Sequence, residues 1–113
     1  MPGSDRFDGS FDAVLAAAQR GAPWAFERIF TALSPVVTGY LRAQGAHEPE
    51  DLASEVFVAV LRNVGSFEGN EPGFRSWVFT IAHRRILDER RKFGRRPVLT
   101  TLSEALDLAA PGD

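Results

Sequence analysis

Apolar side chains recur at three- and four-residue spacing in four blocks of this chain, and glycine and proline separate the blocks. That spacing places the apolar side chains on one face of an α-helix, and no segment shows the strict alternation of a β-strand. We therefore expect an all-α fold, a compact bundle of three to four helices. The expected helical blocks are Ser10 to Gly21, Pro23 to Gly45, Pro49 to Gly65 and about Gly73 to Phe93, with Gly94 as the final C-cap.

The second and third blocks carry expectations of their own. Pro35 interrupts the second block, and because proline removes a backbone donor and crowds the preceding turn, it predicts either a kink near Leu33 or two abutting helices. The third block is apolar on nearly all sides, so we expect its helix to be largely buried. Its apolar residues are Leu52, Ala53, Val56, Phe57, Val60, Leu61 and Val64.

The segment 66–73 is rich in serine, glycine, asparagine and proline and predicts an ordered loop that carries one aromatic residue, Phe67. The helix after it should turn one apolar face to the core. The residues of that face are Phe74, Val78, Ile81 and Ala82.

A chain of 113 residues, 44% of them hydrophobic, is the right size for one folded domain. We expect a disordered N-terminus over residues 1–9, the helical domain over 10–96 and an interdomain linker over 97–113. The absence of cysteine excludes disulfides and thiolate metal sites. No apolar run approaches the roughly 20 residues that span a bilayer, so we expect a cytoplasmic location without membrane insertion.

Charge is strongly segregated along the chain, although the formal net charge is only -2. Residues 1–61 carry four basic and eight acidic side chains, whereas residues 62–96 carry nine basic and four acidic ones. Seven of the basic residues fall within the thirteen positions 84–96. A basic block in an otherwise acidic chain indicates a localised contact with a polyanion.

The last expected helix changes from an aromatic first half to an arginine-rich second half. At 3.6 residues per turn, one stripe of its surface lies away from the apolar face. Its members are Ser76, Trp77, Thr80, Arg84, Asp88 and Arg91, with His83 at the border. We interpret this stripe as a nucleic-acid surface, since cations neutralise phosphates and rings stack on bases. The alternative is that the arginines complement the dipole of the helix C-terminus and keep the helix soluble.

Catalytic or metal-binding groupings are not recognisable in the sequence. His47 and His83 are far apart and lack ligand-like spacing to each other or to carboxylates. Asp51 and Glu55 lie one turn apart near a helix start, where complementing the dipole or docking a partner explains them better than catalysis. With no nucleophile-elbow serine and no glycine-rich phosphate loop, we expect neither an enzyme nor a cofactor.

Three motifs stand in an order that resembles one known family. They are Glu50-Asp-Leu-Ala-Ser-Glu-Val-Phe57, then Val64-Gly-Ser-Phe67, then Phe74-Arg-Ser-Trp-Val-Phe-Thr-Ile-Ala-His83 followed by Asp88 and its arginines. Together they resemble conserved region two of the extracytoplasmic-function sigma factors of bacterial RNA polymerase, over roughly residues 11–97.

This resemblance implies three functional surfaces. The helix with the acidic start would dock on the coiled coil of the largest subunit of core RNA polymerase, through Asp51, Leu52, Ser54, Glu55, Val58 and Arg62. The loop would capture a base flipped from the non-template strand of promoter DNA, and the final helix would read the promoter -10 element and help to open it. The implied DNA contacts are Phe67, Glu68, Gly69, Asn70, Glu71, Arg75, Trp77, Phe79, Thr80, His83, Arg84, Asp88 and Arg91.

Some features depart from the family pattern. Arg84 stands where many relatives place an asparagine for base contact, and Ser54 stands where a longer amide is common. The second, helix-turn-helix domain that such factors usually carry is absent, so we interpret the sequence as a fragment. Two alternatives stay open: a protein-interaction module held by an anti-sigma partner, and a small helix-turn-helix regulator. The loop 66–73 is too long for the tight turn that the second alternative needs.

Overall fold

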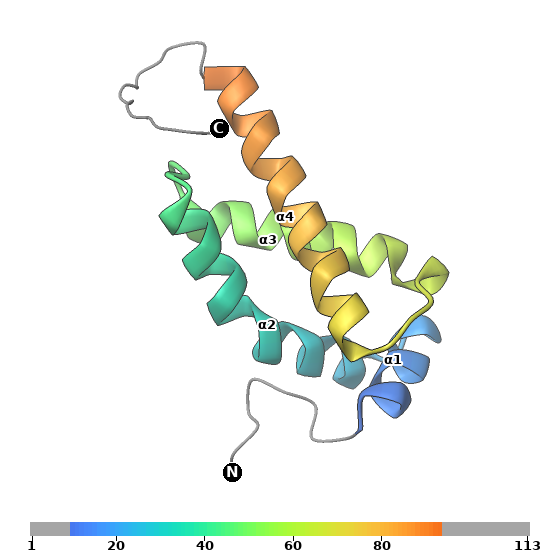
Figure 1. Ribbon diagram of the computed structural model, residues 1–113. Helices are drawn as coiled ribbons and strands as arrows, with labels where there is room; N and C mark the ends of the chain where they lie inside the picture. Colours follow the sequence, from blue (N-terminus) through green and yellow to red (C-terminus); the bar gives the residue numbers. More distant parts are fainter. Residues whose placement is uncertain (1–9, 94–113) are drawn as a thin grey trace.

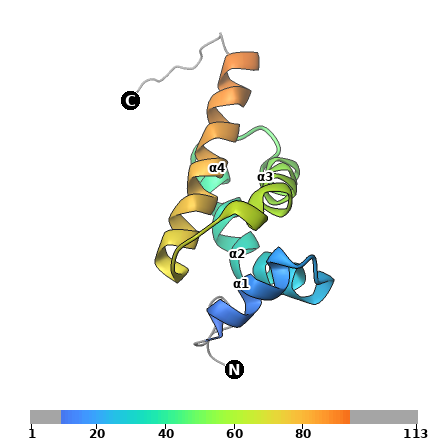
Figure 2. The same ribbon diagram turned by 90° about the vertical axis from the view of Figure 1, so that its right-hand side faces the viewer.

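Four α-helices and one 3-10 turn make up the part of this computed structural model that can be described, residues 10–93. They are α1 (Phe11–Gln19), α2 (Pro23–Ala43), α3 (Pro49–Asn63), the 3-10 turn η1 (Val64–Ser66) and α4 (Glu71–Phe93). Figures 1 and 2 show α4 crossing α3, while α1 lies beside the first half of α2 at the opposite end of the bundle from the last turns of α4. The predicted all-α fold is confirmed, and no strand occurs among residues 10–93.

Proline and glycine set the helix boundaries as predicted. Pro23 and Pro49 each occupy the first position of a helix, where the missing N–H costs nothing. Gly21 and Gly45 follow α1 and α2 with φ of 88° and 86°, a left-handed conformation that glycine adopts without strain. The predicted C-cap Gly94, and the predictions for residues 1–9 and 97–113, lie outside the described residues.

Pro35 lies inside one helix rather than between two, because α2 continues from Pro23 to Ala43. Figure 1 shows the helix changing direction near its middle, as the lost hydrogen bond and the ring of the proline require. Of the two alternatives left by the sequence, the kinked helix is therefore the one observed.

The core consists of apolar side chains, and within residues 10–93 no polar or charged residue is buried. α2 and α4 contribute to it at four-residue intervals, which keeps each set on one helix face. The fully buried residues on these two faces are Ala25, Ile29, Leu33, Val37 and Leu41 from α2 and Phe74, Val78, Ala82 and Ile86 from α4, and α2 also buries Ala32. None of the described helices is both long and apolar enough to cross a membrane.

Two exposed glycines of α2 and its C-terminal turn should respond oppositely to alanine. At Gly45 a Cβ meets nothing within 4 Å, but φ is +86°, so Gly45→Ala should destabilise the fold by about 1 kcal/mol through backbone strain. Gly39 lies within the helix and also has open space around it, so Gly39→Ala should stabilise by about 0.5–1 kcal/mol. Urea unfolding of both variants checks the pair, and a stabilised Gly45→Ala would contradict the assigned turn.

Candidate nucleic-acid interface

The stripe predicted on the last helix lies on the solvent side of α4. Five of its residues are exposed, namely Ser76, Thr80, Arg84, Asp88 and Arg91, and Trp77 is half-buried. The prediction for the opposite face needs one correction. Ile81 is only half-buried, whereas Ile86, which was not predicted, is fully buried, because the core face of α4 follows a strict four-residue interval.

Polar contacts on the stripe leave its cationic side accessible. The hydroxyl of Thr80 donates to the carbonyl oxygen of Ser76 at 2.9 Å, so its oxygen can still accept a bond. Arg91 pairs with Asp88 one turn earlier. Among residues 10–93, Arg84 has no acidic partner within ion-pair distance, so its guanidinium is available to a phosphate or a base edge.

An aromatic cluster fixes the start of α4 and the loop before it. The ring centroid of Phe67 lies 5.2 Å from that of Phe74 and 5.3 Å from that of Trp77. Phe11 of α1 packs on the other side of Phe74, at 5.4 Å. Trp77 is therefore part of this packing and only partly exposed, so a ligand can contact only the part of the indole that solvent reaches.

The loop between η1 and α4 is shorter than predicted, because α4 begins at Glu71 instead of Gly73. The side-chain oxygen of Asn70 accepts the N–H of Gly73 at 2.9 Å, the pattern of a helix N-cap. An ordered loop was predicted here, and Glu68, Gly69 and Asn70 are exposed on it.

Gly69 should not tolerate a side chain. Its φ is +150°, and a Cβ there would lie 2.9 Å from Cζ of Phe67. We expect Gly69→Ala to cost about 1–3 kcal/mol of stability through backbone strain and displacement of the Phe67 ring. Urea unfolding and Trp77 emission in a Trp24→Phe background measure both effects. Gly65→Ala is the control, since a Cβ at Gly65 meets nothing within 4 Å; equal behaviour of the two variants would contradict the prediction.

Phe79 and His83 lie on the side of α4 that faces α2. The hydroxyl of Tyr40 and Nδ1 of His83 are hydrogen-bonded at 3.1 Å. The rings of Tyr40 and Phe79 pack edge to face, with centroids 5.4 Å apart. Tyr40 thus orients two of the predicted DNA contacts.

α3 presents most of the predicted docking residues to solvent. Asp51, Ser54, Glu55, Val58 and Arg62 are all exposed. Leu52 is the exception, since 7% exposure places it in the core and not on an open docking surface.

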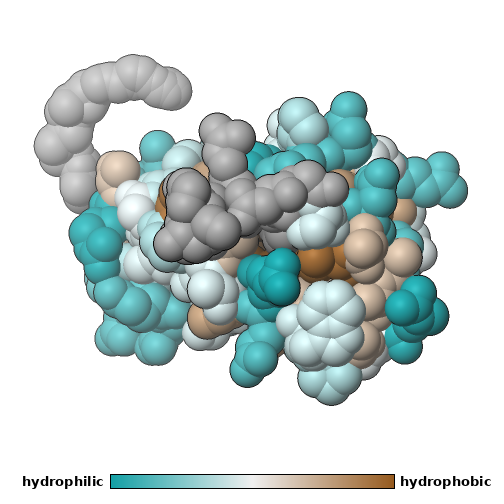
Figure 3. Space-filling view, turned by 90° about the horizontal axis from the view of Figure 1, so that it is seen from below, coloured by the Kyte–Doolittle hydropathy of each residue, from teal (hydrophilic) through white to brown (hydrophobic). Residues whose placement is uncertain are grey.

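The prediction that α3 is largely buried is wrong. Val58 and Leu61 are 46% and 49% exposed, so the outer side of α3 carries apolar as well as polar side chains. Leu61 also borders a groove of about 350 Å³, together with Pro23 and Phe26, near the turn between α1 and α2. Figure 3, the view from below, shows hydrophobic residues exposed among the hydrophilic ones on that side of the molecule.

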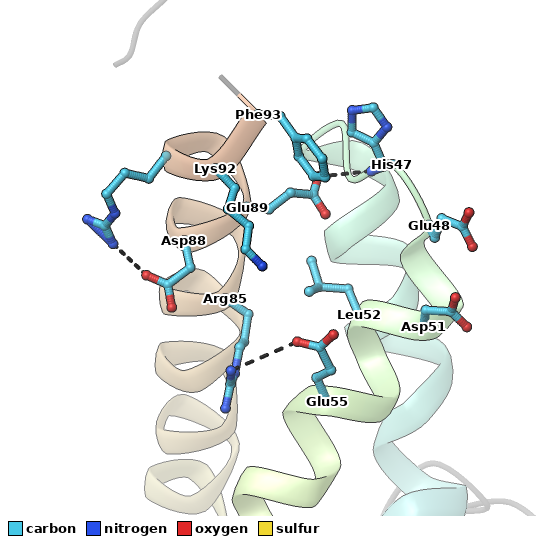
Figure 4. Close-up of a pocket in the computed structure, with 11 residues that line it drawn as sticks. His47, Glu48, Asp51, Leu52, Glu55, Arg85, Asp88, Glu89, Lys92 and Phe93 are labelled. Carbon is cyan, nitrogen blue, oxygen red and sulfur yellow. Dashed lines mark hydrogen bonds and ion pairs between the residues drawn. The ribbon is translucent and has the colours of Figure 1, made fainter. Parts of the chain in front are cut away.

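A cleft of about 560 Å³ separates the first turns of α3 from the last turns of α4 (Figure 4). Its walls bring part of the predicted docking surface opposite part of the predicted DNA surface. Arg85 reaches across it to Glu55, with nitrogen and oxygen 3.9 Å apart. The cleft is lined by His47, Glu48, Asp51, Leu52, Glu55, Arg85, Asp88, Glu89, Arg91, Lys92 and Phe93.

Negative charge is concentrated where α3 begins. A hydrogen bond with Asp51, together with the negative charge of that carboxylate, raises the pKa of Glu48 above its usual range. Two carboxylates this close favour a cationic partner over an anionic one. Within residues 10–93 no group of three or more histidine, aspartate or glutamate side chains is arranged to hold a metal ion.

Several structurally important polar residues gave no signal in the sequence. The backbone N–H of His47 donates to the carboxylate of Glu89 at 2.9 Å. The ring centroids of His47 and Phe93 lie 4.6 Å apart. Arg90 donates to the backbone and the side chain of Gln44. These contacts attach the last turns of α4 to the turn between α2 and α3. The sequence does not predict these contacts, because the bonded residues are more than 40 positions apart in the chain.

Comparisons with known proteins agree with this arrangement. Residues 29–96 match the family described as Sigma-70 region 2. The chain is 32% identical over 108 residues to the ECF RNA polymerase sigma factor BldN of Streptomyces coelicolor, covering 94% of this chain and 40% of that protein. It is 33% identical over 70 residues to the ECF RNA polymerase sigma factor RpoE of Cereibacter sphaeroides, covering 60% and 39%.

A more distant relative is the ECF RNA polymerase sigma factor SigK of Mycobacterium tuberculosis, with 27% identity over 127 aligned positions. No solved structure matches the chain. The chain spans about two fifths of the length of the first two relatives.

Proposed function

The chain belongs to the Sigma-70 region 2 family, in the extracytoplasmic-function group, and from this membership we propose that it docks on core RNA polymerase and holds the melted promoter. In this proposal it recognises the -10 element on the non-template strand and helps to open it, in the cytoplasm with the polymerase. DNA opening is then driven by binding, without hydrolysis and without a catalytic residue.

The observation that carries the proposal is the exposed stripe of α4 beside the aromatic loop. Arg84 and Arg91 can neutralise phosphates, while Trp77, nearer the start of the same helix, and Phe67, which packs on it, offer ring surface. Extracting a base from the duplex stack costs a few kcal/mol. Stacking a single-stranded base on an aromatic ring returns about 1–3 kcal/mol, so a held strand can offset much of that cost.

The exposed face of α3 supports polymerase docking. Asp51 and Glu55 lie one turn apart, and Val58 adds apolar surface on the next turn. Carboxylates around an exposed apolar residue suit a partner helix that offers basic and apolar side chains. We propose the coiled coil of the largest polymerase subunit as that partner.

An anti-sigma protein is a further partner that this surface could serve. The outward-facing Val58 and Leu61 would be covered by either occupant, so inhibition by competition follows directly. The small helix-turn-helix regulator is not favoured, because η1 and four further residues stand between α3 and α4.

Co-purification tests the polymerase half of the proposal. Affinity-tagged chain incubated with bacterial core RNA polymerase should retain the large polymerase subunits through washing at moderate salt. A tagged helical bundle of similar size and net charge serves as the control for non-specific capture. Retention no greater than by the control, with the chain still helical by circular dichroism, would count against the proposal.

A further inference from the structure

Gln19, the last residue of α1, is bonded to the segment that precedes α4. Its side-chain amide donates one hydrogen bond to the carbonyl oxygen of Val64 and one to that of Phe67, both at 2.9 Å. These carbonyls stand at the first residue of η1 and directly after its last residue. The two N–H groups of a single carboxamide therefore clamp both ends of the 3-10 turn.

The clamp fixes where the loop begins. The backbone N–H of Phe67 donates to Val64 at 3.1 Å, and Gln19 holds the carbonyls of the same two residues. From that anchored peptide the Phe67 ring reaches Phe74 and Trp77, at 5.2 Å and 5.3 Å. The far end of the loop is fixed separately by the N-cap residue Asn70. The exposed residues between these two anchors are thus held on a preset backbone.

We infer that Gln19 is a positioning residue for base capture, acting through the loop and touching no DNA itself. This inference rests on the proposed function, in which the loop at Phe67 receives a flipped base. A loop that already has its bound shape loses less conformational freedom when the base enters. Gln19 should therefore determine how much more tightly the chain binds a strand with a base at the loop than a strand that lacks this base. A change at Gln19 should leave phosphate contacts and polymerase docking unaffected.

The chemistry of the clamp selects the test variants. Gln19→Glu keeps the size of the side chain but replaces its donors with oxygens that repel both carbonyls. Gln19→Lys restores donors in place of the amide and should recover part of the function. The matched control is Gln44→Glu, the same chemical change at the end of α2, where the side-chain oxygen accepts from Arg90 on the last turns of α4.

The experiment measures binding of single-stranded promoter oligonucleotides to the full chain with core polymerase. A series of oligonucleotides carries one abasic nucleotide at successive positions. For the unaltered chain, the abasic site that lies in the loop should weaken binding by about 5- to 150-fold, the equivalent of one lost stacking contact. We compare the affinity for the intact oligonucleotide with the affinity for the abasic one. Gln19→Glu should bring the ratio of these two affinities close to one. Gln19→Lys should restore part of the ratio, and Gln44→Glu should leave it unchanged.

The possible failures are distinguishable. A Gln19→Glu ratio equal to that of the unaltered chain would overturn the inference and leave the proposed function standing. If the unaltered chain binds but shows no abasic effect anywhere, base capture by the loop is refuted and the inference with it. Should Gln19→Glu fail to fold by circular dichroism, Gln19→Ala replaces it, because water can then reach both carbonyls. Thermal melting of each variant separates lost stability from lost discrimination.

Discussion

Reversing the two exposed carboxylates of α3, Asp51→Lys together with Glu55→Lys, should lower the affinity for core RNA polymerase by about 100-fold or more. Like charges brought together across an interface cost several kcal/mol, and each 1.4 kcal/mol is a factor of about ten in affinity. The helical circular dichroism should stay unchanged, because both side chains are exposed and the pair between Glu55 and Arg85 is open to water.

The matched control for this variant is Asp12→Lys with Glu27→Lys. It makes the same change in net charge on exposed positions near the starts of α1 and α2. Surface plasmon resonance against immobilised polymerase gives both affinities. An equal loss in the two double variants would show that bulk charge, and not the face of α3, decides docking. Loss of helical signal in the α3 variant alone would reassign Asp51 and Glu55 to structure.

Removing two cations from α4, by Arg84→Gln with Arg91→Gln, should weaken single-stranded DNA binding roughly fifty-fold at about 0.05 M salt. Each phosphate contact on a single strand contributes about 0.7 to the slope of log affinity against log salt, so the slope should fall by about 1.4. The affinity of the double variant should then converge with that of the unaltered chain as salt rises, because the lost contacts are the ones that salt screens.

Arg20→Gln with Arg28→Gln is the control for the DNA variant. These arginines are exposed and lie at the end of α1 and in the first half of α2 (Figure 1), away from the last turns of α4. The control should keep the affinity and the slope of the unaltered chain. An unchanged slope in the α4 variant would mean that Arg84 and Arg91 contact no phosphate.

The sequence predicted the helices well because their boundaries depend on local backbone chemistry. Pro23 and Pro49 begin α2 and α3, and Gly21 and Gly45 follow α1 and α2, for reasons contained within a few residues. The exposed side of α4 followed from the same periodicity, since polar residues recur there at helical spacing.

Predictions about which apolar residues are buried were less accurate, because burial depends on the neighbouring helices. Leu61 fits the apolar pattern of α3 yet faces outward. Ile81 was predicted to be buried but is only half-buried, whereas Ile86 is fully buried. The spacing of apolar residues along one helix does not predict where a neighbouring helix packs against it. The packing of α4 against α2 and α3 settles that question.

The supporting polar residues of the site could not be predicted from the sequence for a different reason. Gln19 and Tyr40 act on partners 39 to 48 positions away, so their roles exist only after the chain has folded. From sequence alone, a glutamine at a helix end is expected to face solvent, and a tyrosine among apolar residues is expected to pack in the core. Their hydrogen bonds show what they orient.

The most direct test of the proposed function is fluorescence anisotropy of a labelled single-stranded non-template oligonucleotide across a salt series, with and without core polymerase. We predict weak binding by the chain alone that strengthens as salt falls, and markedly tighter binding when polymerase is present. Absence of binding at the lowest salt, with polymerase bound and the chain folded, would contradict the claim that α4 and its loop hold a melted DNA strand.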